Sequence, residues 1–218
     1  MDQGPLGALR DLTPPASLDW PRLIQDIRGL GAASAPVLRE ETRQRLLAEA
    51  ARYPFLADPE TVGSGDRLVR QQMGSFASFP PDSGFLRLRD TLQSLLDDGF
   101  ATLDRYPFGT PLAFTDLVLQ RYPAGSLGIT PHRDGLRYAN LICIVVLGGS
   151  GRFFVCRDRA GNDPLEIDAT PGRVILLRAP GLLNSPGVPP VEGDCRPFHY
   201  VTSITETRYT FGLRQTLG

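Results

Sequence analysis

Apolar side chains in the first half of the chain recur at the three- and four-residue spacing of amphipathic helices. Three helices are predicted on this ground: over residues 21–28, over about four turns ending before Pro54, and over residues 85–103. Ser17 or Asp19 is expected to cap the first helix, and Gly29 to end it. The stretch 68–79 is short, apolar and bounded by turn residues, which favours a strand.

After Pro111 the pattern changes to short apolar runs separated by Gly-, Pro- and Asp-rich turns. Strands are predicted over residues 114–122, 140–147, 152–157, 165–169, 174–178, 199–204 and 208–215. Short strands without long helices between them indicate an antiparallel sandwich or barrel and argue against a βαβ fold. The fold class is therefore mainly β with flanking helices.

The length of 218 residues suits a single domain with a sizeable buried core. Within it we predict three parts. Residues 1–35 are rich in Gly, Pro and Ala and are expected to form an N-terminal arm. Residues 36–110 would supply helical and strand support, and residues 111–218 the β core that carries the chemistry.

Composition excludes several classes of function. The 23 basic residues are all arginine, so no Schiff-base lysine and no P-loop lysine is available. The formal net charge of −1 gives no general field for binding a polyanion, and it argues against a purely electrostatic nucleic-acid binder. The only two histidines are His132 and His199, so a three-histidine metal site is also excluded.

Cysteine usage and the terminal sequence favour a cytoplasmic protein. The three cysteines form no CxxC pair, so neither a disulfide framework nor a four-cysteine zinc site is expected. Cys143 and Cys156 lie in apolar runs, where inert buried thiols are expected. The first residues are too polar for a signal peptide, and no apolar run approaches the ~20 residues of a membrane helix.

The candidate chemistry begins at His132-Arg133-Asp134. In extended chain, residues two apart project to the same side, so the imidazole and the carboxylate can converge on one metal ion. His199 is the available third ligand of a facial triad, an arrangement that leaves coordination positions open on Fe(II). Taken alone, an H-x-D tripeptide is common, and a structural, hydrogen-bonded histidine is the alternative.

The C-terminal strand strengthens the functional interpretation. Arg208, Thr210, Gly212 and Arg214 alternate with apolar residues and share one face. If both faces are covered, two guanidinium groups point into a barrel, and burial of a permanent charge calls for an anion such as a small dicarboxylate. The alternative is a solvated edge strand with two exposed arginines.

In these segments the sequence resembles the Fe(II)/2-oxoglutarate-dependent dioxygenases, whose fold is a double-stranded β-helix, or jelly roll. The resemblance covers roughly residues 114–215, the last half of the chain. It rests on the ordered set Gln120-Arg-Tyr122-Pro-Ala-Gly125, His132-x-Asp134, Thr170-Pro-Gly172, His199-x-Val201 and Arg208-x-Thr210. The family pattern implies that His132, Asp134 and His199 hold Fe(II).

The same resemblance implies a cosubstrate site. Arg208 would bind the distal carboxylate of 2-oxoglutarate, with Thr210 alongside and Tyr122 reaching the same molecule. A second arginine six residues later, Arg214, is similar to the AlkB-type branch and would lie near the cosubstrate or the iron. The interval between His199 and Arg208 is closer to that of prolyl hydroxylases.

The implied reaction couples oxidative decarboxylation of 2-oxoglutarate by O2 to hydroxylation, or oxidative demethylation, of a substrate. A small-molecule substrate is expected. Arg121, Arg133 and Arg137 could instead contact the phosphates of a modified nucleic acid, as an AlkB-type demethylase requires, although the net charge does not support this. The remaining alternative is a non-catalytic, cupin-like metal-binding protein.

Overall fold

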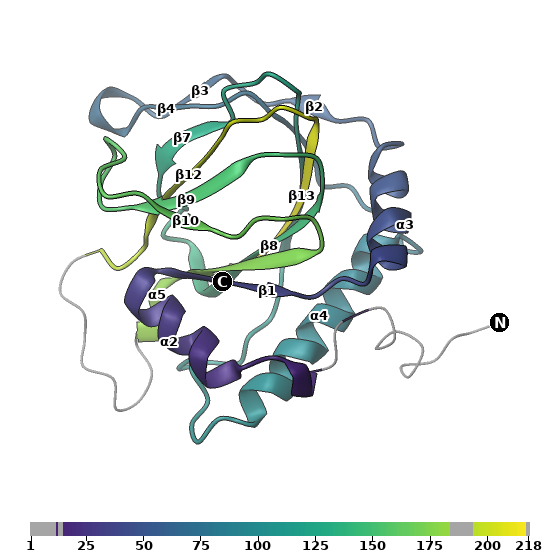
Figure 1. Ribbon diagram of the computed structural model, residues 1–218, viewed down its shortest axis with the longest axis vertical. Coiled ribbons are helices and arrows are strands. Elements are labelled where there is room, and N and C mark those ends of the chain that lie inside the picture. Colours follow the sequence, from purple (N-terminus) through teal and green to yellow (C-terminus); the bar gives the residue numbers. More distant parts are fainter. Residues whose placement is uncertain (1–11, 13–14, 184–193, 217–218) are drawn as a thin grey trace.

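The computed structural model describes residue 12, residues 15–183 and residues 194–216. Two antiparallel sheets face each other, and helices cover the outer side of the larger one (Figure 1). The first half of the described chain contains η2 (Pro15–Ser17), α2 (Trp20–Leu30), β1 (Ala32–Pro36), α3 (Glu40–Ala50), β2 (Leu56–Ala57), β3 (Thr61–Val62), η3 (Gly65–Arg67), β4 (Val69–Arg70), β5 (Gly74–Phe76) and α4 (Gly84–Ala101). The second half contains β6 (Asp116–Tyr122), β7 (Ile129–His132), β8 (Tyr138–Gly148), β9 (Arg152–Cys156), β10 (Leu165–Ile167), β11 (Arg173–Arg178), α5 (Pro180–Leu183), β12 (Phe198–Thr202) and β13 (Arg208–Thr216).

The larger sheet has seven strands in the order β1-β11-β8-β13-β6-β5-β2, and the smaller sheet has four in the order β10-β9-β12-β7. A separate two-stranded sheet joins β3 to β4. Every strand predicted after Pro111 is present within a few residues of its expected limits. The fold class predicted from the sequence, a mainly β jelly roll with flanking helices, is confirmed.

Strand β8 explains why the strongest apolar run lies at the centre of the molecule. Leu141, Cys143 and Val145 pack with the helices, whereas Ile142 and Val146 pack between the two sheets. Because successive side chains of a strand point to opposite faces, a strand buried on both faces is apolar throughout. The Cys143 thiol is fully buried, which raises its pKa well above the usual value, in agreement with the inert role expected.

Helix α2 forms as predicted, with its end displaced. The Asp19 side chain accepts a hydrogen bond from the backbone N–H of Arg22 (3.0 Å), which caps the helix start. The helix continues through Gly29 and stops at Gly31, whose φ of +88° suits glycine. Gly31, and not Gly29, is therefore the terminating residue, because only Gly31 adopts the left-handed conformation.

The segment expected to be an arm contributes to the main sheet. Strand β1 pairs antiparallel with β11, from Ala32 opposite Leu177 to Pro36 opposite Arg173. Helix α2, which precedes it, buries an apolar face made of Trp20, Leu23, Ile24 and Ile27. The described part of residues 1–35 thus belongs to the folded body, whereas residues 1–11 and 13–14 lie outside the described residues.

None of the helices in the described part of the chain is long and apolar enough to cross a membrane.

Candidate metal centre

The two histidines lie opposite each other on neighbouring strands of the smaller sheet. His132 is the last residue of β7, and His199 is its partner in β12, with ring centroids 4.3 Å apart. Pro131, just before His132, has no N–H to donate, and it is tolerated because β7 is an edge strand. The pairing register shifts between His199 and Val201, so an irregularity of the kind that re-aims side chains lies beside the histidine pair.

Asp134 completes the group from the loop just beyond β7. Its Oδ2 lies 3.4 Å from Nε2 of His199, and the potential ligand atoms of His132, Asp134 and His199 all lie within 4.8 Å of one another. The convergence predicted from the H-x-D spacing is therefore present, although Asp134 lies two residues past the end of β7.

Both imidazoles are oriented by backbone carbonyls. Nδ1 of His132 lies 2.9 Å from the carbonyl oxygen of Thr130, and Nδ1 of His199 lies 3.3 Å from that of Pro197. When Nδ1–H donates to a carbonyl, the lone pair of Nε2 is free to bind a metal. Hydrogen bonds of this kind are the usual way in which proteins fix the metal-binding tautomer of histidine. Two imidazole nitrogens and one carboxylate oxygen suit Fe(II), so the residues present fit such an ion.

The electrostatics of the apo site keep its ligands ready for a cation. Burial, reinforced by the electrostatic interaction with neighbouring His199, lowers the pKa of His132 to about 4, so its imidazole is neutral at pH 7. Burial opposes the ionisation of Asp134, but electrostatic interactions with His199 and Arg214 outweigh this effect and lower its pKa. A neutral imidazole and an ionised carboxylate are the forms that bind metal.

Arg208 is the most unusual buried group of the molecule. Its side chain is 1% exposed, and within the described part of the chain it donates only two long hydrogen bonds, to the carbonyl oxygens of Gly151 (3.3 Å) and Ala169 (3.5 Å). Its Nε has no partner, and among the described residues no carboxylate pairs with it. Burial lowers the pKa of this guanidinium to about 10, so it remains charged at neutral pH. A buried cation without a counter-ion fits a bound carboxylate.

The three candidate metal ligands and Arg208 line one cavity. Its lining is Gln120, Tyr122, Ile129, His132, Asp134, Ile144, Phe153, His199, Val201, Arg208, Thr210 and Arg214. All seven residues that the sequence analysis placed in the metal or cosubstrate site belong to this lining. The Thr210 hydroxyl donates a hydrogen bond to Oε1 of Gln120 at 3.5 Å. Burial raises the pKa of Tyr122 to about 12, so its hydroxyl stays protonated at neutral pH. Arg214 lies on the metal side, its Nε 4.0 Å from Oδ1 of Asp134.

The three arginines considered for phosphate binding all have partners within the protein. Arg133 pairs with Asp194 at 3.0 Å, Arg121 stacks over the Phe55 ring, and Arg137 donates to the Tyr138 hydroxyl at 2.7 Å.

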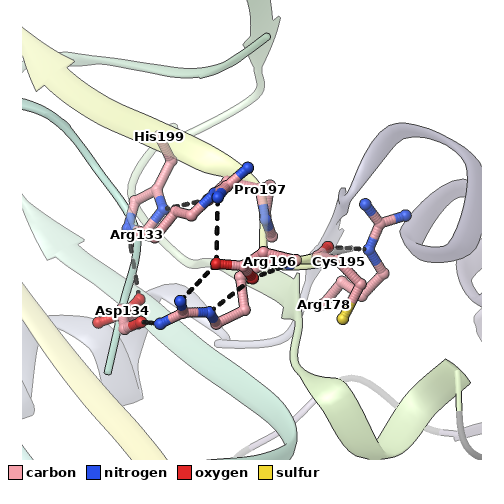
Figure 2. A network of polar contacts seen from close by, with 8 residues as sticks. Arg133, Asp134, Arg178, Cys195, Arg196, Pro197 and His199 are labelled. Atoms are coloured by element: carbon pink, nitrogen blue, oxygen red, sulfur yellow. Dashed lines mark hydrogen bonds and ion pairs between the residues drawn. The ribbon is translucent and has the colours of Figure 1, made fainter. Parts of the chain in front are cut away.

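Sequence reasoning missed the polar residues that support the ligands. Arg196 donates a hydrogen bond to the backbone carbonyl of Asp134 (Figure 2). Asp194 in turn pairs with both Arg196 and Arg133. A contact that ends on a backbone carbonyl leaves no residue pattern in a sequence. The one available signal was the alternation of Asp194 and Arg196 a few residues ahead of His199.

Neither a protein-family model nor a curated protein sequence matches the chain. Solved structures do. A prolyl hydroxylase from Trichoplax adhaerens, in complex with a hypoxia inducible factor oxygen degradation domain peptide fragment, has a TM-score of 0.63 and 15% identity over 90% of this chain and 88% of that one. A Pseudomonas putida prolyl-4-hydroxylase has a TM-score of 0.61 and 13% identity over 91% and 99% of the two chains. A 2OG-Fe(II) oxygenase family oxidoreductase from Burkholderia pseudomallei has a TM-score of 0.61 and 17% identity over 92% of each chain.

These likenesses show that the chain has the jelly-roll fold of the 2OG-Fe(II) oxygenases, as the resemblance implied. Within that class, the fold is similar to that of prolyl hydroxylases, in keeping with the short interval between His199 and Arg208. The AlkB-type branch stays a prediction.

Proposed function

We propose that the protein is an Fe(II)/2-oxoglutarate-dependent dioxygenase that hydroxylates a C–H bond of its substrate. One observation carries the proposal: three metal-ligating side chains converge in the same buried cavity as Arg208, a cation without a carboxylate partner among the described residues. The fold supports it, because solved 2OG-Fe(II) oxygenases have the same architecture.

His132, Asp134 and His199 would hold the iron, and Arg208 would bind the distal carboxylate of 2-oxoglutarate. Bound there, iron and cosubstrate would supply the redox chemistry in which 2-oxoglutarate and O2 yield succinate and CO2 while the substrate C–H becomes C–OH. The protein's part is to orient these groups. The neutral His132 and ionised Asp134 offer their electron pairs, and the Tyr122 hydroxyl, opposite Arg208 in the strand register, is available to donate a hydrogen bond to the cosubstrate.

The apolar part of the cavity would limit the access of water to the bound cosubstrate. Ile129, Ile144, Phe153 and Val201 contribute this lining between the two sheets. Phe153 stacks against the His199 ring, with centroids 5.6 Å apart and an angle of 18° between the planes. Such packing restricts the rotation of the imidazole and so helps to keep it directed at the metal site.

The test is the conversion of 2-oxoglutarate to succinate, measured in the presence of Fe(II), ascorbate and O2. Small molecules, proline-containing peptides and methylated oligonucleotides would be added in turn as stimulants of turnover, because the small-molecule substrate expected from the sequence stays a prediction. The cytoplasmic location stays a prediction as well. We expect basal succinate formation that Asp134→Ala and His199→Ala abolish. Metal binding without any turnover would indicate the cupin-like alternative, and full activity in Asp134→Ala would overturn the proposal.

A further inference from the structure

The segment that leads into β12 forms a polar clamp on the metal centre. The guanidinium of Arg196 forms a fork with Asp194: Nε donates to Oδ1 at 2.8 Å, and a terminal nitrogen donates to Oδ2. The other terminal nitrogen donates to the backbone carbonyl of Asp134. Figure 2 shows Arg196 beside Asp134 on one side and the segment that leads to His199 on the other.

The loop that carries Asp134 needs such a contact. Strand β7 ends at His132, so Asp134 lies in irregular backbone beyond the last residue of the ladder and just ahead of Gly135. A carboxylate in this position is not fixed by strand pairing, whereas His199 lies within β12 and pairs on both sides, with His132 and with Val155. Of the three candidate ligands, Asp134 thus depends most on side-chain contacts for its position.

The clamp holds the H-x-D segment at a second point. Asp194 also pairs with Arg133, the residue between the two ligands, with Oδ2 3.0 Å from its Nη1. The Asp194 carboxylate therefore holds the H-x-D segment in two ways. It pairs directly with the Arg133 side chain, and through Arg196 it is linked to the backbone carbonyl of Asp134. Only an arginine can make the two parallel bonds of the fork and still offer a third donor to a carbonyl.

The clamp is itself anchored to the main sheet. The carbonyl of Cys195 accepts a hydrogen bond from Nε of Arg178 at 2.7 Å, at the end of β11. Arg178 also donates to the carbonyl of Arg28 in α2. Motion of the clamp relative to the sheet would break these hydrogen bonds. The clamp therefore fixes the position of Asp134 relative to the main sheet.

We infer that Arg196 is a positioning residue. Its hydrogen bond to the backbone carbonyl of Asp134, held in place by its fork with Asp194, keeps Asp134 where its carboxylate can bind the metal. The inference rests on the proposed function, because it takes Asp134 as a metal ligand. Groups that orient metal ligands from the surrounding shell change metal affinity by about 10- to 100-fold when they are removed. Arg196→Met should therefore weaken metal binding by about this factor.

The control is an arginine with equivalent contacts that does not line the cavity. Arg43 donates from Nε to Glu40 (2.8 Å) and from Nη1 to the backbone carbonyl of Leu147 (2.6 Å). Its side chain is 12% exposed, against 15% for Arg196. Arg43→Met removes an equivalent set of contacts from α3, so a general loss of stability would affect both variants alike.

The experiment is an anaerobic titration of Fe(II), and in parallel of Mn(II), into the metal-free protein, with the dissociation constant and the melting temperature of the apo form recorded for each variant. We expect wild type and Arg43→Met to bind equally, and Arg196→Met to bind about 10- to 100-fold more weakly. Asp194→Asn, which retains the volume but not the fork, should weaken binding in the same direction. If Arg196→Met does not fold, Asp194→Asn and Arg196→Lys take its place.

Two failures are distinguishable. If wild type does not bind the metal, or if His199→Ala binds as well as wild type, the proposed metal site is wrong. If wild type binds and His199→Ala does not, but Arg196→Met and Asp194→Asn retain the wild-type dissociation constant, the site stands and the positioning role of Arg196 is overturned. An equal weakening in Arg43→Met would also overturn it, because the effect would then reflect stability alone.

Discussion

Arg208 and Tyr122 stand directly opposite each other in the ladder that joins β13 to β6, and both side chains are buried in the cavity between the sheets. Their proximity affects both pKa values. The positive charge of Arg208 partly offsets the rise that burial causes in the pKa of Tyr122, and Tyr122 partly offsets the fall that burial causes in the pKa of Arg208. Arg208 brings to this cavity a positive charge that no carboxylate of the described residues pairs with, and the candidate metal ligands line the same cavity.

Replacing Arg208 should have opposite effects on stability and on cosubstrate binding. In the absence of an anion the buried guanidinium is a cost to folding, so Arg208→Met is expected to stabilise the apo protein by about 1–2 kcal/mol. The same change should raise the KM for 2-oxoglutarate at least about tenfold, since a hydrogen bond to a charged group contributes about 1.5–3 kcal/mol. Urea unfolding and succinate formation measure the two effects. An unchanged KM would refute the role given to Arg208.

Arg214 should behave differently from Arg208, although both lie on the same face of β13. Its Nε is 4.0 Å from Oδ1 of Asp134, and its guanidinium packs over the Tyr138 ring. We expect Arg214→Met to weaken metal binding while changing the KM for 2-oxoglutarate less than Arg208→Met does. Metal titration and steady-state kinetics at saturating metal separate the two. A larger KM effect from Arg214→Met would assign the cosubstrate carboxylate to Arg214.

Metal should stabilise the folded protein through the three converging ligands. A ligand at 100 times its Kd contributes about 2.7 kcal/mol, which for a chain of this size corresponds to a rise in Tm of roughly 5–10 °C. We expect this rise with Mn(II), its reversal by a chelator, and its loss in Asp134→Ala. Differential scanning calorimetry of apo and loaded protein provides the measurement. A Tm that is indifferent to metal in wild type would argue against the site.

The β core was predictable because its strands are buried in ways that leave a pattern. Strand β8 is apolar from Leu141 to Leu147, as a strand covered on both faces is expected to be. Strand β13 alternates arginine and threonine with phenylalanine and leucine because one face lines the cavity. The spacing of His132 and Asp134 predicted that the two side chains converge, and they do, although Asp134 lies in irregular backbone just beyond β7. From these patterns the three metal ligands and the two inward-facing arginines could be proposed, whereas the roles of Tyr122 and Thr210 came only from the family resemblance.

Other features have no such pattern. Strand β1 consists of alanine, serine and proline, residues with low strand propensity, and it forms because β11 offers an unpaired edge and α2 packs beside it. Strand β7 contains Pro131 and follows Gly128, so its sequence indicates a turn, although pairing with β12 holds it extended. The bond from Arg196 to the carbonyl of Asp134 depends on the tertiary fold alone.

The contact between α2 and α4 provides a test of whether the N-terminal segment belongs to the folded body. A Cβ added at Gly99 in α4 would lie 2.0 Å from Cε2 of Trp20 in α2, so Gly99→Ala cannot be accommodated without moving the indole. If α2 packs as the structure has it, Gly99→Ala should destabilise the protein by about 1–3 kcal/mol, in spite of the higher helix propensity of alanine. If residues 1–35 were a detached arm, the same change would be neutral or stabilising.

The matched control is Gly29→Ala in α2, where an added Cβ meets nothing within 4 Å. Here alanine should stabilise the protein by up to about 1 kcal/mol, because it reduces the conformational entropy of the unfolded chain without any clash. Urea unfolding of both variants gives the two signs directly. Opposite signs place α2 against α4 and make the N-terminal segment a structural part of the sheet that carries Arg208, whereas a gain in both variants would contradict that packing.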